Sequence, residues 1–202
     1  MKRKPLFPWL SGLFLAAALL TGCQSPPVAA PIPGDASVRN NCYSLLHQLL
    51  AEQKEVNLLH FIKSEPGDVK NLVGRIATAS GTGARLLEDF ARDDPTIRLD
   101  ETRLPAGEVA ARAAIASTKE TELLHQTGNE FELTLLLTQT EALNYAWHMA
   151  QVAADHEPDP GRARALAGVS ADMQNLYHQV FQLMLSKAKS AATNPFPPHP
   201  TR

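Results

Sequence analysis

Residues 129–156 read NEFELTLLLTQTEALNYAWHMAQVAADH, and this stretch decides the fold. In its first half the apolar side chains lie nearly all round a helix, which is typical of a helix that neighbours bury on every side. Pro158 and Pro160 follow it and end it, because proline cannot continue a helix. We therefore predict that residues 129–156 form the central helix of an all-α protein.

Apolar residues at three- and four-residue spacing predict further helices on both sides of this segment. The expected ranges are residues 37–64, 68–91 and 162–189, with a weaker, alanine-rich helix over residues 108–126. The sequence has no strand-like alternation of any length. A four-helix bundle in an up-down arrangement buries all the long apolar stripes at once, and the weaker helix is expected to be a short extra connection.

The middle of the second predicted helix contains Ser80, Gly81 and Gly83. A glycine inside a helix costs about 1 kcal/mol relative to alanine. Small residues at this place either let a neighbouring helix approach closely or let the helix bend.

The first 23 residues have the three-part order of a secretory signal. Lys2, Arg3 and Lys4 open the chain, an apolar run follows, and Leu20-Thr21-Gly22-Cys23 closes it. A helix that spans a membrane needs roughly 20 consecutive apolar residues. This run is shorter and is interrupted by Pro8, so an uncleaved membrane anchor is the less favoured alternative.

Small residues followed by a cysteine resemble the lipobox of bacterial lipoproteins. The resemblance implies that residues 1–22 are removed and that Cys23 becomes the N-terminus with a covalent lipid of the palmitate type. No other cofactor is expected. In Gram-negative lipoproteins an aspartate after the cysteine favours the inner membrane, so Gln24 favours the outer membrane, with the protein facing the periplasm.

The remaining chain divides by composition. Residues 23–36 are rich in proline and are predicted to be an extended tether. Residues 37–190 are predicted to be the helical bundle domain, and residues 191–202, again rich in proline, a disordered tail.

The net charge of this domain limits the classes of partner that it can bind. The whole chain has a formal net charge of −2, and residues 1–22 carry three basic residues and no acid, so the mature domain is more acidic. A mildly acidic domain without clusters of lysine or arginine excludes nucleic acid and argues against electrostatic attraction to anionic lipid. The lipid anchor is expected to hold it to the membrane, where another envelope protein or a second copy is the expected partner.

Cys42 is the only other cysteine, so it has no partner within the chain if Cys23 is acylated. It could be a free thiol that bridges two copies, or it could stay buried. Burial is favoured, because Cys42 lies in register with Leu45 and Leu49 and a free cysteine behaves as a small apolar residue.

Glu52 lies on the same predicted stripe, and a buried carboxylate costs several kcal/mol unless it is paired or coordinated. Glu141, His178 and His60 are candidates to face it. Either a polar or metal-binding centre lies inside the bundle, or Glu52 makes an ordinary hydrogen bond at the edge of the stripe. We favour the second reading and predict no metal site and no catalytic residues.

Two further patterns have ordinary interpretations. Glu122 and His125 have the Glu-x-x-His spacing of di-iron bundles, but such a centre needs two of these motifs and further glutamates. We interpret this pair as solvated. The aromatic residues Tyr145, Trp147 and Tyr177 are interpreted as core residues.

Gly128-Asn129-Glu130-Phe131-Glu132 resembles the start of the third helix in a ferritin-like family of exported bacterial proteins of unknown function, which are described as predicted outer-membrane proteins. His178 after Gln174, and the region of Glu52 and Glu55, fit the same pattern. The resemblance implies a ferritin-like bundle. This chain departs from the family at two places: it has Ala79-Ser80 where the family carries an Asp-His pair, and Leu143 where the family carries a histidine. These departures imply that any metal site has been lost.

These observations predict a non-enzymatic, lipid-anchored envelope protein that serves as an interaction or structural module. One alternative is a ferritin-like metal-binding or redox protein that uses Glu52, Glu141 and His178. The other is a periplasmic chaperone or stress-sensing protein, because residues 137–141, LTQTE, come near the Leu-Thr-x-x-Gln motif of one such group.

Overall fold

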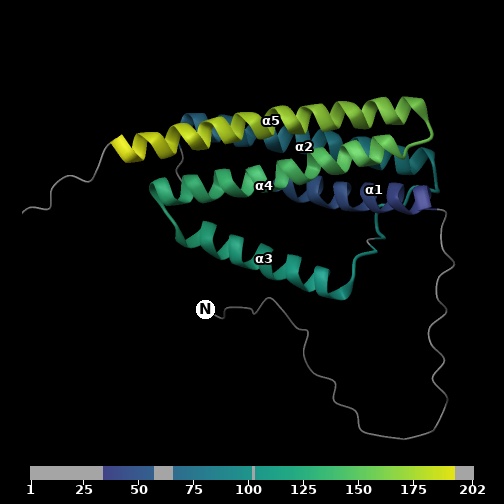
Figure 1. Cartoon of the computed structure of the whole chain (residues 1–202), viewed down its shortest axis with the longest axis horizontal. Helices are drawn as coiled ribbons and strands as arrows, with labels where there is room; N and C mark the ends of the chain where they lie inside the picture. The colour runs from purple at the N-terminus through teal and green to yellow at the C-terminus, as the bar shows by residue number, and fades with distance from the viewer. Residues whose placement is uncertain (1–33, 57–65, 102, 194–202) are drawn as a thin grey trace, which may run out of the picture. The chain divides into compact units, whose positions relative to one another are not determined.

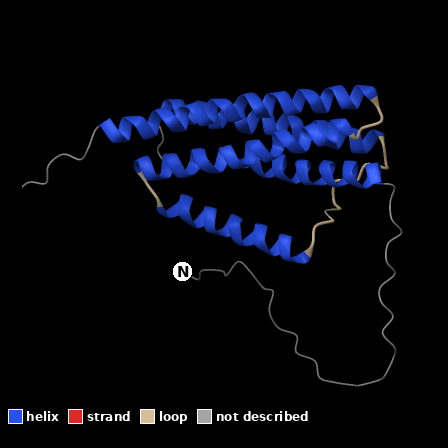
Figure 2. Ribbon diagram, in the orientation of Figure 1, coloured by secondary structure: helices blue, strands red, loops and turns tan. Residues whose placement is uncertain are grey.

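The computed structural model describes residues 34–56, 66–101 and 103–193. All of them belong to one compact unit, Ile32–Arg202. They form five α-helices, and no strand occurs among the described residues (Figure 2). The predicted all-α bundle is therefore confirmed. Residues 23–33 of the predicted tether, Cys23 included, and 194–202 of the predicted tail lie outside the described residues. Residues 34–36 and 191–193 belong to the first and last helices, so their assignment to the tether and the tail was wrong.

The helices are α1 (Gly34–Gln53), α2 (Gly67–Asp93), α3 (Ala106–His125), α4 (Gly128–Asp155) and α5 (Pro160–Thr193). Four of the predicted ranges agree with these bounds to within a few residues. The first predicted helix is the exception, because α1 ends at Gln53 and a short 3₁₀ turn follows it through Val56. The rest of that predicted helix lies outside the described residues.

Two antiparallel helix pairs build the bundle, α1 with α2 and α4 with α5 (Figure 1). The pairs lie side by side, with α1 against α4 and α2 against α5. The chain passes from the end of α2 to the start of α4 through α3, which runs along the outside of the bundle. The two helix pairs are thus joined by one long crossover that contains α3.

The buried stripe of α1 is Cys42, Tyr43, Leu46 and Leu50, which belong to the main core cluster. On the predicted stripe Leu45 is buried as expected, but Leu49 is only half-buried and Glu52 is exposed, so the stripe was wrong by part of a turn. The reason is that α1 packs between α2 and α4. Leu45, Leu49 and Glu52 instead flank this contact on the side that faces α3.

Gly83 shows which of the two effects of the small residues in α2 operates. α2 runs as one helix from Gly67 to Asp93. A Cβ atom at Gly83 would lie 2.8 Å from Cδ1 of Leu50 on α1, closer than real Cβ contacts come. The small residue therefore allows α1 and α2 to approach closely.

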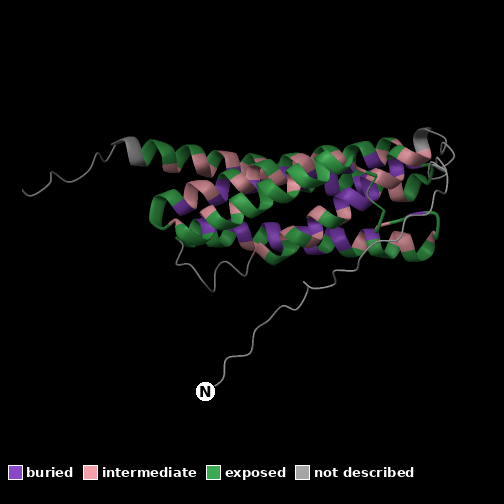
Figure 3. Cartoon of the chain, turned by 90° about the horizontal axis from the view of Figure 1, so that it is seen from below, coloured by how far each residue is buried: buried purple, intermediate pink, exposed green. Residues whose placement is uncertain are grey.

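α4 has neighbours on several sides, as its sequence predicts. It packs against α5, α1 and α3. Figure 3 shows the buried positions distributed along the bundle. The buried residues of α4 are Phe131, Leu135, Leu136, Gln139, Leu143, Ala146, Ala150 and Ala153. None of the helices in the described ranges combines the length and the hydropathy that a membrane span requires.

Candidate functional site: a groove between α1, α3 and α4

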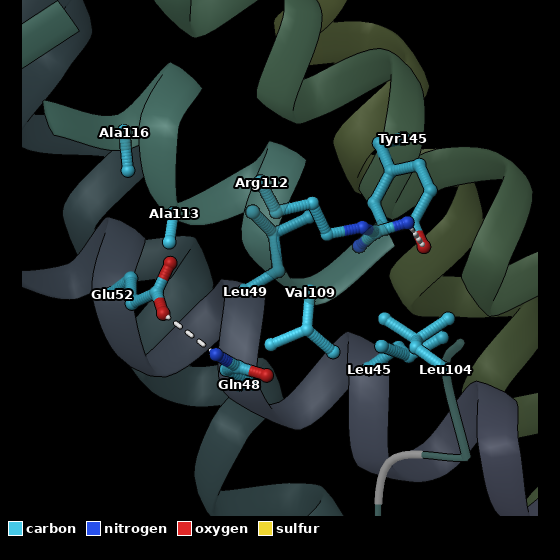
Figure 4. Close-up of a pocket in the computed structure, with 10 residues that line it drawn as sticks. All are labelled: Leu45, Gln48, Leu49, Glu52, Leu104, Val109, Arg112, Ala113, Ala116 and Tyr145. Carbon is cyan, nitrogen blue, oxygen red and sulfur yellow. Dashed lines mark hydrogen bonds between the residues drawn. The ribbon is translucent and has the colours of Figure 1, made fainter. Parts of the chain in front are cut away.

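A groove of about 320 Å³ lies between α1, α3 and α4. Its apolar lining comes from Leu45 and Leu49 on α1, from Leu104 before α3, and from Val109 on α3 (Figure 4). The groove exists because α3 packs mainly against α4 and lies over the flank of α1 without closing on it.

Arg112 holds α3 against α4 at this groove. Its Nη2 donates a hydrogen bond to the hydroxyl of Tyr145 at 3.0 Å, and its Nε donates to Oε1 of Glu108 at 2.7 Å. The guanidinium carbon also lies 5.0 Å from the centre of the Tyr145 ring, within cation–π range. The hydrogen bonds to Glu108 and Tyr145 raise the pKa of Arg112, so its positive charge is permanent.

The rest of α3 makes little contact with the bundle. Leu123, near its C-terminal end, is its one buried residue among those described. Val109 is 50% exposed and Ile115 is 59% exposed. Of these two side chains, Val109 lines the groove and Ile115 does not.

Glu52 lies at the edge of this groove and points toward α3 (Figure 4). Its carboxylate accepts a hydrogen bond from Nε2 of Gln48 at 3.1 Å, and it pairs with no cation among the described residues. Glu52 also lines a neighbouring hollow together with Glu55 and Asp100. The groove therefore has an apolar lining with Arg112 in it, and the carboxylates of Glu52 and Glu55 lie at its margin.

The structure does not gather the residues proposed for an interior polar or metal centre. Glu52, Glu141 and His178 are all exposed, and the described residues contain no group of three or more potential ligands. His60 lies outside the described residues. The suggestion that Glu52 faces the core was wrong because the buried stripe of α1 is rotated away from it.

Glu122 and His125 each contact a residue of their own helix, α3. Glu122 lies 3.8 Å from Nζ of Lys119, and Nδ1 of His125 lies 2.8 Å from the carbonyl oxygen of Thr121. Each member of this pair therefore has a local partner one helical turn before it in the chain.

Cys42 is buried in the core, in agreement with the burial that its register predicts. Burial raises the pKa of its thiol to about 11. The thiol is therefore protonated at neutral pH, and the reactive thiolate is scarce.

A buried polar network at one end of the bundle was not predicted from the sequence. The hydroxyl of Tyr43 donates a hydrogen bond to Oε2 of Glu157 at 2.6 Å. Arg162 donates to Oε1 of the same carboxylate from Nε at 3.0 Å and from Nη2 at 2.8 Å. The side chain of Glu157 is fully buried. Burial alone would raise its pKa, but the hydrogen bonds from Arg162 and Tyr43 outweigh burial and hold the pKa below its usual value.

The network continues to the connection after α2. Nη2 of Arg162 lies 3.1 Å from Oδ2 of Asp94, and the hydroxyl of Thr96 donates to Oδ1 of Asp94 at 2.6 Å. Nη2 of Arg39 on α1 donates to the Thr96 hydroxyl at 3.1 Å. Two arginines balance two carboxylates, so the network joins α1 and two connections without leaving net charge in the interior.

Neither the groove nor the network has a signature in the sequence. Arg112 and Tyr145 are 33 residues apart, and Tyr43 and Glu157 are 114 apart. The turn over residues 157–162, EPDPGR, marks a helix boundary in the sequence, but it does not indicate that Glu157 and Arg162 have partners elsewhere in the chain.

Of the three aromatic residues predicted to be in the core, Trp147 and Tyr177 pack against it but stay partly exposed, and Tyr145 lies outside it. Tyr145 lines the groove, and Trp147 and Tyr177 are half-buried on the outer side of α4 and α5.

Comparison of the chain with models of protein families, with curated proteins and with solved structures finds no match.

Proposed function

We propose that this chain is a membrane-anchored envelope lipoprotein whose helical domain is a non-enzymatic binding module. The groove between α1, α3 and α4 is its binding site, and this groove is the observation that carries the proposal. The lipobox residues 20–23 support the anchor, and the partial exposure of α3 supports a binding role.

The lining of the groove defines the chemistry of its partner. Leu45, Leu49 and Val109 would accept apolar side chains, since removing apolar surface from water favours association. Glu52 and Glu55 at the margin would attract lysine or arginine and repel acidic segments. The partner proposed for the groove is therefore an amphipathic segment of an envelope protein with apolar and basic side chains.

A photoreactive amino acid at Val109 tests the groove in intact cells, because Val109 both lines the groove and is half exposed. The matched control places it at Thr78, an exposed position on α2. We expect a discrete crosslinked species from position 109 and none from position 78. Equal crosslinking from both positions would argue against a binding site in the groove.

Cys23→Ser, combined with a signal that does not require lipidation, tests the anchor. We expect the variant in the soluble fraction and the unchanged chain in the membrane fraction. Mass spectrometry of the unchanged chain should show a lipid on Cys23. Membrane retention of the serine variant would contradict the lipid anchor.

A chaperone-like role is a second candidate, favoured by the exposed apolar residues Val109, Ile115 and Leu124 on α3. It predicts that the purified protein suppresses aggregation of an unfolded client and that Ile115→Ser reduces this protection. If the purified protein does not suppress aggregation of the client, this role is ruled out.

The resemblance to the ferritin-like family stays a prediction that the long crossover supports. The metal or redox alternative has no support from the placement of Glu52, Glu141 and His178. Metal analysis of the purified protein and of Glu52→Ala tests it directly.

A further inference from the structure

Five aromatic and imidazole rings form one continuous patch on α4 and α5. We call Trp147, His148, Tyr177, His178 and Phe181 the ring patch. His148 stacks on Trp147 with ring centres 4.2 Å apart, and Tyr177 lies 6.1 Å from Trp147. Phe181 stacks nearly parallel to Tyr177 at 6.2 Å, and His178 lies 5.3 Å from Tyr177.

The ring patch faces outward. His148 and His178 are exposed, and Trp147, Tyr177 and Phe181 are half-buried. Trp147 and Tyr177 also pack against the main core cluster. The core therefore holds these two rings in place while part of each ring remains available to a ligand.

The two helix segments that carry the ring patch contain no charged residue, and the nearest charge given by a hydrogen bond is Arg75 of α2, which donates to Gln179. Residues 142–154 of α4 and residues 173–186 of α5 contain no Asp, Glu, Lys or Arg, although such residues make up 20% of the chain. The solvent side of a surface helix usually carries charged residues. Here the polar positions in line with the rings are amides: Asn144, Gln151, Gln174 and Gln182.

We propose that the ring patch binds an uncharged glycan chain. A pyranose ring presents C–H groups on its faces, which pack on aromatic rings, and hydroxyl groups at its edge, which pair with amides and imidazoles. An apolar protein helix would fit less well, because it would bury the imidazoles and the amides of Asn144, Gln174 and Gln182 without supplying hydrogen-bond partners, whereas Gln151 already pairs with Asp155 and Ser170. The absence of charge from both segments matches a neutral ligand. This site is separate from the groove and does not depend on the proposed function.

Trp147 provides a direct reporter. The chain has two tryptophans, so in the full chain with Trp9→Phe the emission comes from Trp147 alone. We expect a saturable change in this emission on titration with a soluble oligomer of N-acetylglucosamine or with a glucose oligomer of the same length. A neutral ligand also predicts little change in affinity between about 0.05 and 0.5 M salt.

His148→Ala combined with His178→Ala removes two exposed members of the ring patch, and His125→Ala removes an exposed histidine from α3 as the control. The double variant is expected to weaken glycan binding by about tenfold or more, and the control to leave it unchanged. Circular dichroism and the unfolding midpoint establish that both variants fold.

Several results would overturn the proposal. These are no change in Trp147 emission with either oligomer, equal affinity in the double variant, or binding that salt abolishes. Concentration-dependent dimerisation that the double variant abolishes, without glycan binding, would assign the ring patch to self-association. None of these results bears on Val109 crosslinking, so failure here is distinguishable from failure of the groove.

Discussion

Ser44 and Ser80 are both fully buried, but only one of them is hydrogen-bonded. The hydroxyl of Ser44 donates to the carbonyl oxygen of Arg98 at 2.6 Å and so fastens α1 to the connection after α2. The hydroxyl of Ser80 on α2 has no hydrogen-bond partner among the described residues. A buried polar group without a partner costs about 1–3 kcal/mol.

The same substitution at these two serines should have opposite effects. Ser80→Ala is expected to raise the free energy of unfolding by about 1 kcal/mol, because it removes an unsatisfied hydroxyl and favours the helix. Ser44→Ala is expected to lower it by about 1–2 kcal/mol, because the Arg98 carbonyl loses its donor. Urea unfolding followed by circular dichroism measures both changes. Equal destabilisation by the two variants would show that the Ser80 hydroxyl has a role.

At the scale of elements, two glycines of α2, Gly81 and Gly83, differ in how much space the neighbouring helix α1 leaves beside them. Both Gly81 and Gly83 are buried. A Cβ atom at Gly81 would meet its nearest neighbour, Cβ of Lys54, at an ordinary 3.7 Å. At Gly83 it would meet Cδ1 of the fully buried Leu50 at 2.8 Å.

Gly81→Ala should therefore raise the free energy of unfolding by up to about 1 kcal/mol through helix propensity. Gly83→Ala has the same propensity gain but forces Leu50 to move, and overpacking of this kind costs about 1–3 kcal/mol. We expect Gly83→Ala to be the less stable of the two. Adding Leu50→Ala should remove the penalty in a double-mutant cycle, and the absence of such coupling would contradict the close approach.

α3 is the helix with the weakest attachment. One buried residue, Leu123, and the contact between Arg112 and Tyr145 hold it to the bundle. Most of the stability of a helix in a protein comes from tertiary packing of its apolar face, and α3 has little of this packing. α3 should therefore open locally more often than the helices that form the core.

Hydrogen exchange can test this expectation. Amides of residues 106–125 should exchange faster than those of α4 in the unchanged chain. Arg112→Ala should speed exchange further in the first half of α3, and Arg85→Ala, on the exposed side of α2, should not. Similar protection of α3 and α4 would mean that α3 is a firm part of the bundle.

At the scale of the whole molecule, the network around Glu157 joins parts of the chain that no helix pair joins. It connects Tyr43 on α1, the residues after α2, and the turn between α4 and α5. Removing one member of a buried ion pair costs about 3–5 kcal/mol, and the cost of changing Glu157 lies at the lower end because Arg162 keeps Asp94 as a partner. The stability of this end of the bundle therefore depends on the network as a unit.

The network predicts acid sensitivity with a definite sign. The pKa of Glu157 is lower in the folded chain than its unfolded value of about 4.3. Its contribution is therefore complete above that unfolded value and is lost as the pH falls through the folded pKa. Glu157→Gln should lower the free energy of unfolding by about 3 kcal/mol at pH 7 and flatten its dependence on pH below about 5.

Glu141→Gln is the control, because Glu141 is exposed on α4. It should leave the free energy of unfolding within about 0.5 kcal/mol of the unchanged chain and preserve its pH dependence. A Glu157→Gln variant with the same acid sensitivity as the unchanged chain would contradict the network.

Predictions from the sequence succeeded where the signal is local. Apolar spacing and helix-breaking residues predicted α2, α3, α4 and α5, because each signal lies within the helix that it predicts or just beyond it. The stripe on α1 was predicted less well, because Leu45 and Leu49 have the same spacing as Leu46 and Leu50. Periodicity alone does not say which of two adjacent stripes faces the neighbouring helices.

Local composition was enough to establish that this chain is helical, where most of its helices begin and end, and that Cys42 is buried. Packing between distant segments decided the rest: the exposure of Glu52, the groove beneath α3, the Glu157 network and the outward ring patch. The physical reason is that helix propensity and apolar spacing act over a few residues. The direction of each side chain instead depends on which helices lie beside it, and those helices are far away in the chain.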